Sequence, residues 1–235
     1  MSGVLAVLEK ELLTYFRSPI AYFVLAVFFV GTGYFFTYNV FMTGDATMNE
    51  TFQNMGVLLV IVLPMVTMRI FSAEYSARTM ELLSALPLRP RQIVLGKYLA
   101  AAVMLLLMTL GTVINLIPLY LYGKPETTAV LSGYIGFFAL GMACLAVGQL
   151  FSALTQNQIV AALATICALL AFWFVGYLQG FQQSYELKSL FRHLSFSLHY
   201  ANFVQGLVRT ESLAFYAAVI AIALTLNASY LEWRR

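Results

Sequence analysis

Charged residues are scarce in this chain, and their scarcity decides its class. Asp, Glu, Lys and Arg make up 10% of the 235 residues, whereas a soluble globular domain carries about 25%. Hydrophobic residues make up 61%, and the mean hydropathy is +0.84. A soluble protein of this size needs a polar exterior, but long stretches here have no polar face. The composition therefore predicts an integral membrane protein.

Cysteine and histidine are also rare, with two of each. Cys144 and Cys167 fall inside apolar runs and lack CxxC spacing, so neither a disulfide framework nor a metal site is indicated. His193 and His199 are six residues apart, which turns them about 240° from each other on a helix and gives them no shared ligand face. The net charge of +3 is too small to suggest a nucleic-acid partner.

The apolar runs hold no Asp, Glu, Lys or His near their middles. An ion-coupled transporter or a small respiratory subunit would show intramembrane acids, paired histidines or an inverted repeat, and we find none of these in the sequence. Asn115 and Asn227 are the strongest polar groups within the runs. We interpret both as interhelical hydrogen-bonding residues, with a pathway-lining role as the alternative.

Runs of about 20 apolar residues predict six membrane-spanning helices. The second run is the shortest and contains Pro64, but Arg69 near its end can reach the interface, so a full crossing is expected. An even number of spans places both termini on one side of the membrane. The predicted spans are residues 20–41, 55–71, 98–122, 129–154, 159–180 and 213–231.

Lys and Arg are distributed unequally between the two sides of the membrane. The side with the termini, the 69–97 loop and the 155–158 turn holds Lys10, Arg17, Arg69, Arg78, Arg89, Arg91, Lys97, Arg234 and Arg235. The other side holds Lys124, Lys188, Arg192 and Arg209. Nine against four is a positive-inside bias, which predicts that the loop and both termini are cytoplasmic.

Two segments are amphipathic rather than membrane-spanning. Residues 1–19 place apolar side chains at helical spacing and gather Glu9, Lys10 and Glu11 on the remaining arc, which predicts a helix lying in the interface plane. Residues 181–212 repeat Leu and Phe at helical intervals, which predicts one or two amphipathic helices on the outer side.

The fourth predicted span carries a stripe of small residues on one helical face, at intervals of three and four. Small side chains let helix backbones approach closely. The stripe predicts close packing, either within the subunit or across a dimer. Its members are Gly141, Cys144, Gly148 and Ser152.

The segment 69–97 holds seven of the 23 charged residues. A charged block between two apolar runs cannot lie in lipid, so it must be a water-facing connector where a soluble partner could dock. Within it we expect a short amphipathic helix over residues 72–86, closed by Pro87 and Pro90. A contact that transmits force needs apolar area for affinity and charged groups that fix how the two surfaces align. A short amphipathic helix would supply both. A solvated connector without a partner is the alternative.

This loop resembles the coupling region of ABC-type-2 permeases. Arg78 stands where that pattern has Gly. Arginine is compatible with a continuing helix, but it does not readily replace a glycine that is needed at positive φ. Segments 154–162 and 199–216 are most similar to the gliding-motility-associated subgroup. The matching loop residues are Glu74, Thr79, Glu81, Leu82, Leu83, Pro87, Ile93, Val94, Gly96 and Lys97.

The resemblance covers essentially the whole chain and implies a single all-α permease domain over residues 1–235. It implies six transmembrane helices, an interfacial elbow helix over 1–19, a cytoplasmic coupling loop over 72–97, and re-entrant outer helices within 181–212. It also implies a multi-pass protein of the bacterial inner membrane that forms a homodimer. Residues expected to contact an ATPase are Glu74, Arg78, Thr79, Glu81, Leu82 and Leu83.

No nucleotide site is found in the sequence, because neither Gly96-Lys97 nor Gly123-Lys124 has the glycine spacing or the following Ser or Thr of a P-loop. The resemblance therefore implies a non-catalytic export subunit, with ATP and Mg bound by two copies of a separate ATPase. Further implied partners are membrane lipid and an accessory subunit with a large outer domain. A mechanical or scaffolding complex that acts on an outer partner without passing a solute is the alternative function.

Overall fold

The computed structural model describes residues 3–43, 47–80, 88–123, 125–181 and 185–234, and helices form nearly all of them. Within these ranges there is no β-strand. The first half contains α1 (Gly3–Arg17), α2 (Pro19–Thr43), α3 (Asn49–Thr67), α4 (Ser72–Ser76), α6 (Pro90–Thr112), the 3₁₀ turn η1 (Val113–Asn115) and α7 (Leu116–Tyr122). The second half contains α8 (Thr127–Leu154), α9 (Gln158–Phe174), the 3₁₀ segment η2 (Val175–Phe181), α10 (Tyr185–Leu194), α11 (Phe196–Val204) and α12 (Thr210–Trp233).

Six helical stretches are long and apolar enough to cross a membrane, which confirms the predicted number of spans. The second starts at Asn49 and the third at Pro90, six and eight residues before the predicted starts at 55 and 98. Both helices carry polar residues in their first turns, so a search for purely apolar runs begins too late. The consequence matters for function, because Lys97 lies inside α6 rather than in the loop before it.

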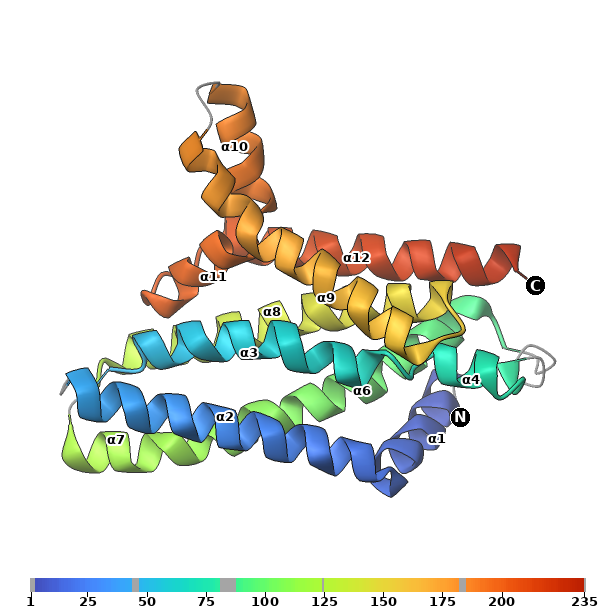
Figure 1. Ribbon diagram of the computed structural model, residues 1–235, viewed down its shortest axis with the longest axis horizontal. Coiled ribbons are helices and arrows are strands. Elements are labelled where there is room, and N and C mark those ends of the chain that lie inside the picture. Colours follow the sequence, from blue (N-terminus) through green and yellow to red (C-terminus); the bar gives the residue numbers. More distant parts are fainter. Residues whose placement is uncertain (1–2, 44–46, 81–87, 124, 182–184, 235) are drawn as a thin grey trace.

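The long helices run side by side, with α3 and α8 at the centre (Figure 1). These two are mostly buried, whereas α2, α6, α9 and α12 expose much of their apolar surface at the periphery. Gly133 and Gly136 of α8 allow the rings of Phe52 and Phe203 to pack against its backbone. Both chain termini lie at the same end of the molecule, as an even number of spans requires (Figure 1).

The third span bends where α6 passes through η1 into α7. Pro118 lies in the first turn of α7, and a proline has no N–H and clashes with the carbonyl four residues before it. The 3₁₀ turn at Val113–Asn115 absorbs this change in the hydrogen-bond pattern.

A single helix over residues 72–86 does not form. The helix α4 ends at Ser76, because Thr79 N–H donates to Glu74 O and Arg78 N–H donates to Tyr75 O. This is the Schellman pattern of helix termination, in which the residue after the C-cap adopts a left-handed conformation. Arg78 is that residue, with φ of 56°. The rest of the predicted helix, residues 81–86, lies outside the described residues.

The segment between the fifth and sixth spans is helical, and its η2 and α10 project away from the bundle (Figure 1). The helix α11 ends in the same pattern as α4, with Gly206 N–H donating to Phe203 O and Leu207 N–H donating to Asn202 O. Its left-handed residue is Gly206, with φ of 83°. Glycine adopts this conformation without the cost that Arg78 incurs.

Candidate functional site

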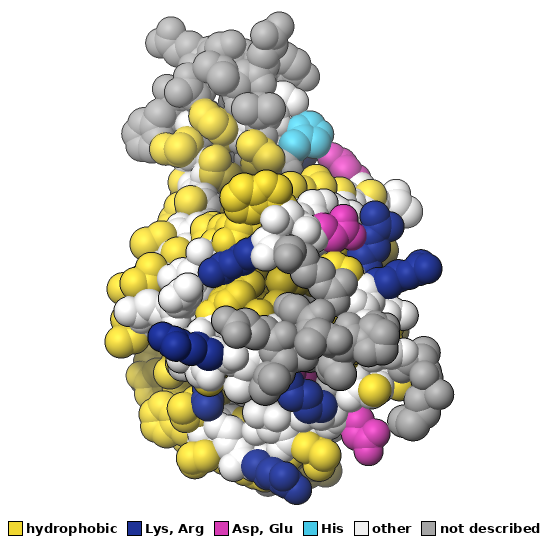
Figure 2. Space-filling model, turned by 90° about the vertical axis from the view of Figure 1, so that its right-hand side faces the viewer, with side chains coloured by type: hydrophobic (Ala, Val, Ile, Leu, Met, Phe, Trp, Pro, Cys, Tyr) yellow, Lys and Arg dark blue, Asp and Glu magenta, His cyan; other side chains and the backbone are white. Residues whose placement is uncertain are grey.

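Charged side chains gather at the end of the molecule that holds both termini. Figure 2 faces this end and shows several Lys and Arg side chains spread across it. Here α1, the corner between α3 and α4, and the first turns of α6 meet. The site described below is built from these elements.

Lys97 of α6 is the centre of the site, and its side chain is only 1% exposed. Its Nζ donates a 2.8 Å hydrogen bond to Glu11 Oε1 and a 2.9 Å hydrogen bond to the carbonyl of Ile70, and it forms an ion pair with Glu74 Oε2 at 3.0 Å. The ring of Phe71 lies below it, with 5.2 Å between Nζ and the ring centroid. An ammonium group has three donors, and two of them make hydrogen bonds here, while both neighbouring carboxylates balance its charge. A lysine can be buried because it is paired in this way.

Lys10 completes a network of two lysines and two glutamates. Its Nζ lies 2.8 Å from Glu74 Oε1 and 3.5 Å from Glu11 Oε1. Burial lowers the pKa of Lys10, but the hydrogen bond to Glu74 and the negative charges of Glu74 and Glu11 outweigh this effect and raise the pKa overall. The network is electrically balanced, and it connects α1, α4 and α6.

Gly96 brings α1 close enough to α6 for this network to form. A Cβ on Gly96 would lie 2.7 Å from Val7 Cβ and 3.0 Å from the carbonyl oxygen of Val4. Val4, Val7 and Glu11 share one face of α1 at helical spacing, so this contact also directs Glu11 toward Lys97. The larger apolar side chains of α1, including Leu5 and Leu13, are exposed on its outer side.

Ser152 fixes the corner between α3 and α4 to the central helix α8. Its Oγ accepts hydrogen bonds from the N–H groups of Phe71 (3.0 Å) and Ser72 (3.2 Å), and it donates to the carbonyl of Met68 (3.0 Å). The side chain thereby satisfies backbone groups that the helix termini leave without partners. The helix α4 is thus held by α8 on one side and by the ion network on the other.

A cavity of ≈ 710 Å³ opens between α1, the α3–α4 corner and α6. Arg69 extends into this region and donates a 2.7 Å hydrogen bond to Ser18 Oγ, at the junction of α1 and α2. The polar lining comprises Lys10, Glu11, Thr14, Tyr15, Ser18, Arg69, Glu74, Thr79 and Lys97.

The predicted ATPase-contact residues separate into three groups. Glu74 is half-buried in the ion network rather than presented on the surface, with 13% of its side chain exposed. Arg78 and Thr79 are exposed at the turn after α4. Glu81, Leu82 and Leu83 lie outside the described residues. The described part of the loop therefore presents residues 76–79 to solvent, and we refer to these four as the loop tip.

The small-residue stripe of α8 lies at contacts within the subunit. A Cβ on Gly141 would meet Leu105 of α6, and a Cβ on Gly148 would meet Thr67 of α3. Cys144 is completely buried, and Ser152 binds the α3–α4 corner.

The interhelical hydrogen bonds predicted for Asn115 and Asn227 are not formed with the residues that the structure describes. Asn115 is half-exposed at the bend in the third span. Asn227 is fully buried on α12, and its side chain has no hydrogen bond to any residue that the structure describes. Gln149 instead makes the interhelical bond, from its Nε2 to the carbonyl of Val94 at 2.9 Å. The described ranges also contain no group of three or more His, Cys, Asp or Glu side chains suited to a metal ion.

Sequence reasoning missed the places of Lys10, Glu11 and Arg69 in this site, and it treated Lys97 only as part of a motif. One signal could have identified the network. Lys97 lies in a helix that begins at Pro90 and becomes apolar around it, and a lysine at such a position requires an acidic partner. Glu11, which lies on the inner face of the amphipathic helix α1, supplies that partner.

Comparison with known protein families identifies a relative family. A family model described as ABC-2 family transporter protein matches residues 41–226, which is more than half of the chain. The match includes α4, α6 and Lys97, and it begins after α1. No curated protein matches the sequence.

Proposed function

This chain belongs to the ABC-2 family of transporter proteins, and from that premise we propose that it couples ATP hydrolysis by a separate ATPase to export across the bacterial inner membrane. The family makes it a multi-pass permease component of an ABC transporter. The proposal adds the direction of transport, the membrane, the cytoplasmic position of the charged end, and the route by which force enters the spans.

The buried ion network is the observation that carries this proposal. A force applied to the loop tip acts directly on α4, since the tip begins at Ser76, the last residue of α4, and forms the tight turn after it. Glu74 of α4 is bound to Lys97 of α6 and to Lys10 of α1, and Ser152 binds the same corner to α8. Buried charge pairs resist separation because each separated charge would be left without a partner. Displacement of the tip would therefore move three helical elements together.

The partners follow from this role. We propose two ATPase subunits, which bind ATP and Mg, and a second copy of this chain as the other half of the transmembrane assembly. We also propose, from the resemblance to the gliding-motility-associated subgroup, an accessory subunit with a large outer domain.

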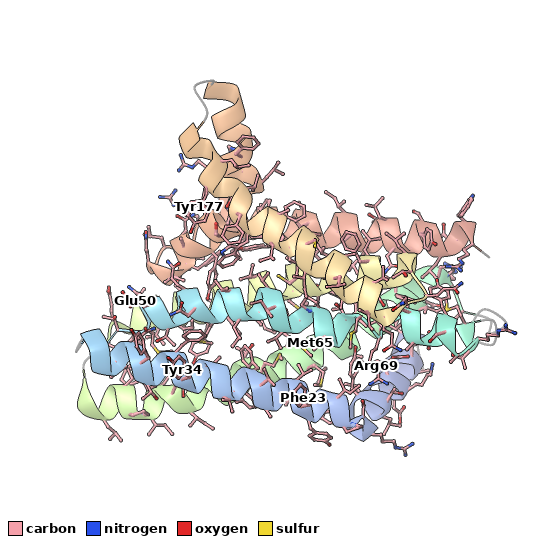
Figure 3. All side chains as sticks on the ribbon, viewed as in Figure 1. Phe23, Tyr34, Glu50, Met65, Arg69 and Tyr177 are labelled. Atoms are coloured by element: carbon pink, nitrogen blue, oxygen red, sulfur yellow. The ribbon has the colours of Figure 1, made fainter. Side chains whose placement is uncertain are left out.

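A mechanical complex that acts on an outer protein without passing a solute is a second candidate. The segments η2 and α10 support it, because they project from the bundle and expose Tyr177, Leu178 and Leu194 (Figures 1 and 3). Stoichiometric copurification of an outer-domain protein, with no solute pathway between the two permeases, would favour this candidate over export.

Charge reversal at the loop tip tests the coupling proposal. Arg78 is exposed, so Arg78→Glu changes the surface that faces the ATPase without disturbing the ion network. We expect several-fold less ATPase to copurify with the permease, or several-fold slower ATP hydrolysis by the purified complex. The reason is that a charge of the wrong sign at an interface repels the partner. The matched control is Arg91→Glu on α6, which makes the same charge change at a residue whose side chain is 78% exposed. Equal complex yield and activity in both variants would refute the coupling role of the tip.

A further inference from the structure

An arginine at the end of α12 stacks on a tyrosine of α4. The guanidinium carbon of Arg234 lies 4.3 Å from the centroid of the Tyr75 ring. Arg234 Nη1 also donates a 3.4 Å hydrogen bond to the hydroxyl of Tyr230, one turn earlier on α12. Tyr75 lies between Glu74 of the ion network and Ser76, the first residue of the loop tip. The element that carries the loop tip therefore contacts α12 as well as α1, α6 and α8.

The other contacts at the charged end hold α12 weakly. The ion network and Ser152 bind α4 and its corner to α1, α6 and α8 rather than to α12. Arg91 of α6 pairs with Glu232 of α12 at 3.8 Å, but these side chains are 78% and 50% exposed, and ion pairs at such positions add little stability. The stacking of Arg234 on Tyr75 is better placed to carry movement of α4 into α12, because a guanidinium plane is attracted to the face of an aromatic ring.

Asn227 adds no polar bond between the C-terminal half of α12 and the helices α6 and α8, against which α12 packs. Its side chain is fully buried, and neither Oδ1 nor Nδ2 has a hydrogen-bond partner among the residues that the structure describes. A bonded amide in the interior resists displacement, because separation leaves its partners without hydrogen bonds. Asn227 has no such bond to lose, so the C-terminal half of α12 can move without this cost.

The N-terminal half of α12 is anchored, in contrast. Ser212 Oγ is hydrogen-bonded to His199 Nδ1 at 3.0 Å and accepts a 3.3 Å hydrogen bond from Asn202 Nδ2. The hydroxyl of Tyr216 donates a 3.0 Å hydrogen bond to the carbonyl of Phe196. All three partner residues belong to α11. The helix α12 is thus fixed at one end and loosely held at the other, which favours a pivoting movement about the fixed end.

We propose that Tyr75 and Arg234 are positioning residues, which transmit a displacement of α4 to the C-terminal end of α12 so that α12 pivots about its contacts with α11. This inference rests on the proposed coupling function, since the ATPase would supply the displacement of α4. The ring of Tyr75 is the part that acts on Arg234, because the Tyr75 hydroxyl is buried without a hydrogen-bond partner in the described part of the chain.

Hydrogen–deuterium exchange of the complex purified with its ATPase tests this role. Exchange is measured by mass spectrometry with and without Mg²⁺ and the non-hydrolysable ATP analogue AMP-PNP. The segments compared are residues 90–97 at the start of α6 and residues 226–234 at the end of α12. In the unmodified complex we expect the nucleotide to change exchange in both segments. Tyr75→Leu and Arg234→Gln should each lose the change in residues 226–234 and keep the change in residues 90–97.

Two controls separate the contact from general damage to the protein. Tyr75→Phe keeps the ring and removes a hydroxyl that has no hydrogen bond to lose among the described residues, so it should respond as the unmodified complex does. Tyr34→Leu makes the same change of side chain at an exposed position on α2, toward the end of the molecule opposite α4 (Figure 3). It should also respond as the unmodified complex does.

The possible results separate this inference from the proposed function. Unchanged exchange of residues 90–97 in the unmodified complex would refute the coupling function, and the inference would fall with it. A change in residues 90–97 together with an undiminished change in residues 226–234 in both Tyr75→Leu and Arg234→Gln would overturn the inference alone. Equal loss in both segments would also overturn it, since the contact would then serve the charged end as a whole. If Tyr75→Leu does not assemble, Arg234→Gln decides by itself, because Arg234 is exposed.

Discussion

Lys97 joins the three elements of the charged end, and its burial makes it sensitive to the loss of a partner. We predict that Lys97→Met destabilises the protein by about 3–5 kcal/mol, because Glu11 and Glu74 would then share only the partly exposed Lys10. Lys10→Met should cost less than about 1 kcal/mol, since the side chain of Lys10 is 54% exposed. Thermal or denaturant unfolding in detergent measures both changes.

A double variant separates the ion pair from simple packing. Glu11→Gln combined with Lys97→Met removes both partners, so it should recover part of the stability that Lys97→Met loses. Strictly additive losses would show that Lys97 and Glu11 do not interact across the α1–α6 contact.

Protonation of His199 should change the free energy of unfolding near neutral pH. Burial lowers the pKa of His199 below its ordinary value, although the carbonyl of His193 and the charge of Glu211 act in the opposite direction. The unfolded chain therefore binds more protons below about pH 6.5. The stability that neutral His199 contributes is complete above this pH and is lost as the pH falls toward the lowered folded-state pKa.

We therefore predict that the melting temperature falls between about pH 7.5 and about pH 5.5, and falls less in His199→Gln. His193→Gln is the control, because the His193 side chain is exposed and its contacts are with the carbonyl of Ser189 (2.7 Å) and with Glu211 (3.3 Å). If His199→Gln and the unmodified protein showed the same decrease, the pH dependence would belong to other groups.

The contact between α1 and α6 depends on the absence of a side chain at Gly96. We predict that Gly96→Val destabilises the protein by about 1–3 kcal/mol, because the new side chain would collide with Val7 and with the backbone at Val4. The control is Gly33→Ala in α2, where a Cβ meets nothing within 4 Å. There the change should be neutral or stabilising by up to about 1 kcal/mol, since alanine favours a helix. Similar melting temperatures for the two variants would contradict the close packing of α1.

The spans could be predicted from sequence because each depends on a local property, a run of apolar residues long enough to cross a bilayer. The ion network could not be predicted as easily, since Glu11 and Lys97 are 86 residues apart and meet only through tertiary packing at Gly96. The end of α4 was mispredicted for another reason. Its left-handed position carries Arg78 instead of the glycine that normally indicates such an end.

The whole molecule is asymmetric along the spans. The ion network, the cavity and the loop tip share one end with both termini, and the projecting segments η2 and α10 lie away from that end (Figure 1). The membrane orientation proposed here follows from this asymmetry and from the positive-inside bias. It places an ATPase at the loop tip and leaves the start of α12 on the opposite side.

Site-specific photocrosslinking in the intact complex tests this arrangement most directly. A photoreactive residue is introduced at Thr79 in the loop tip, and separately at Val208, which is exposed beside the start of α12. We predict a covalent adduct with the ATPase from position 79 and none from position 208. An intact, hydrolysing complex that gives no adduct from position 79, or gives one from position 208, would contradict the assignment of the charged end as the site of ATPase coupling.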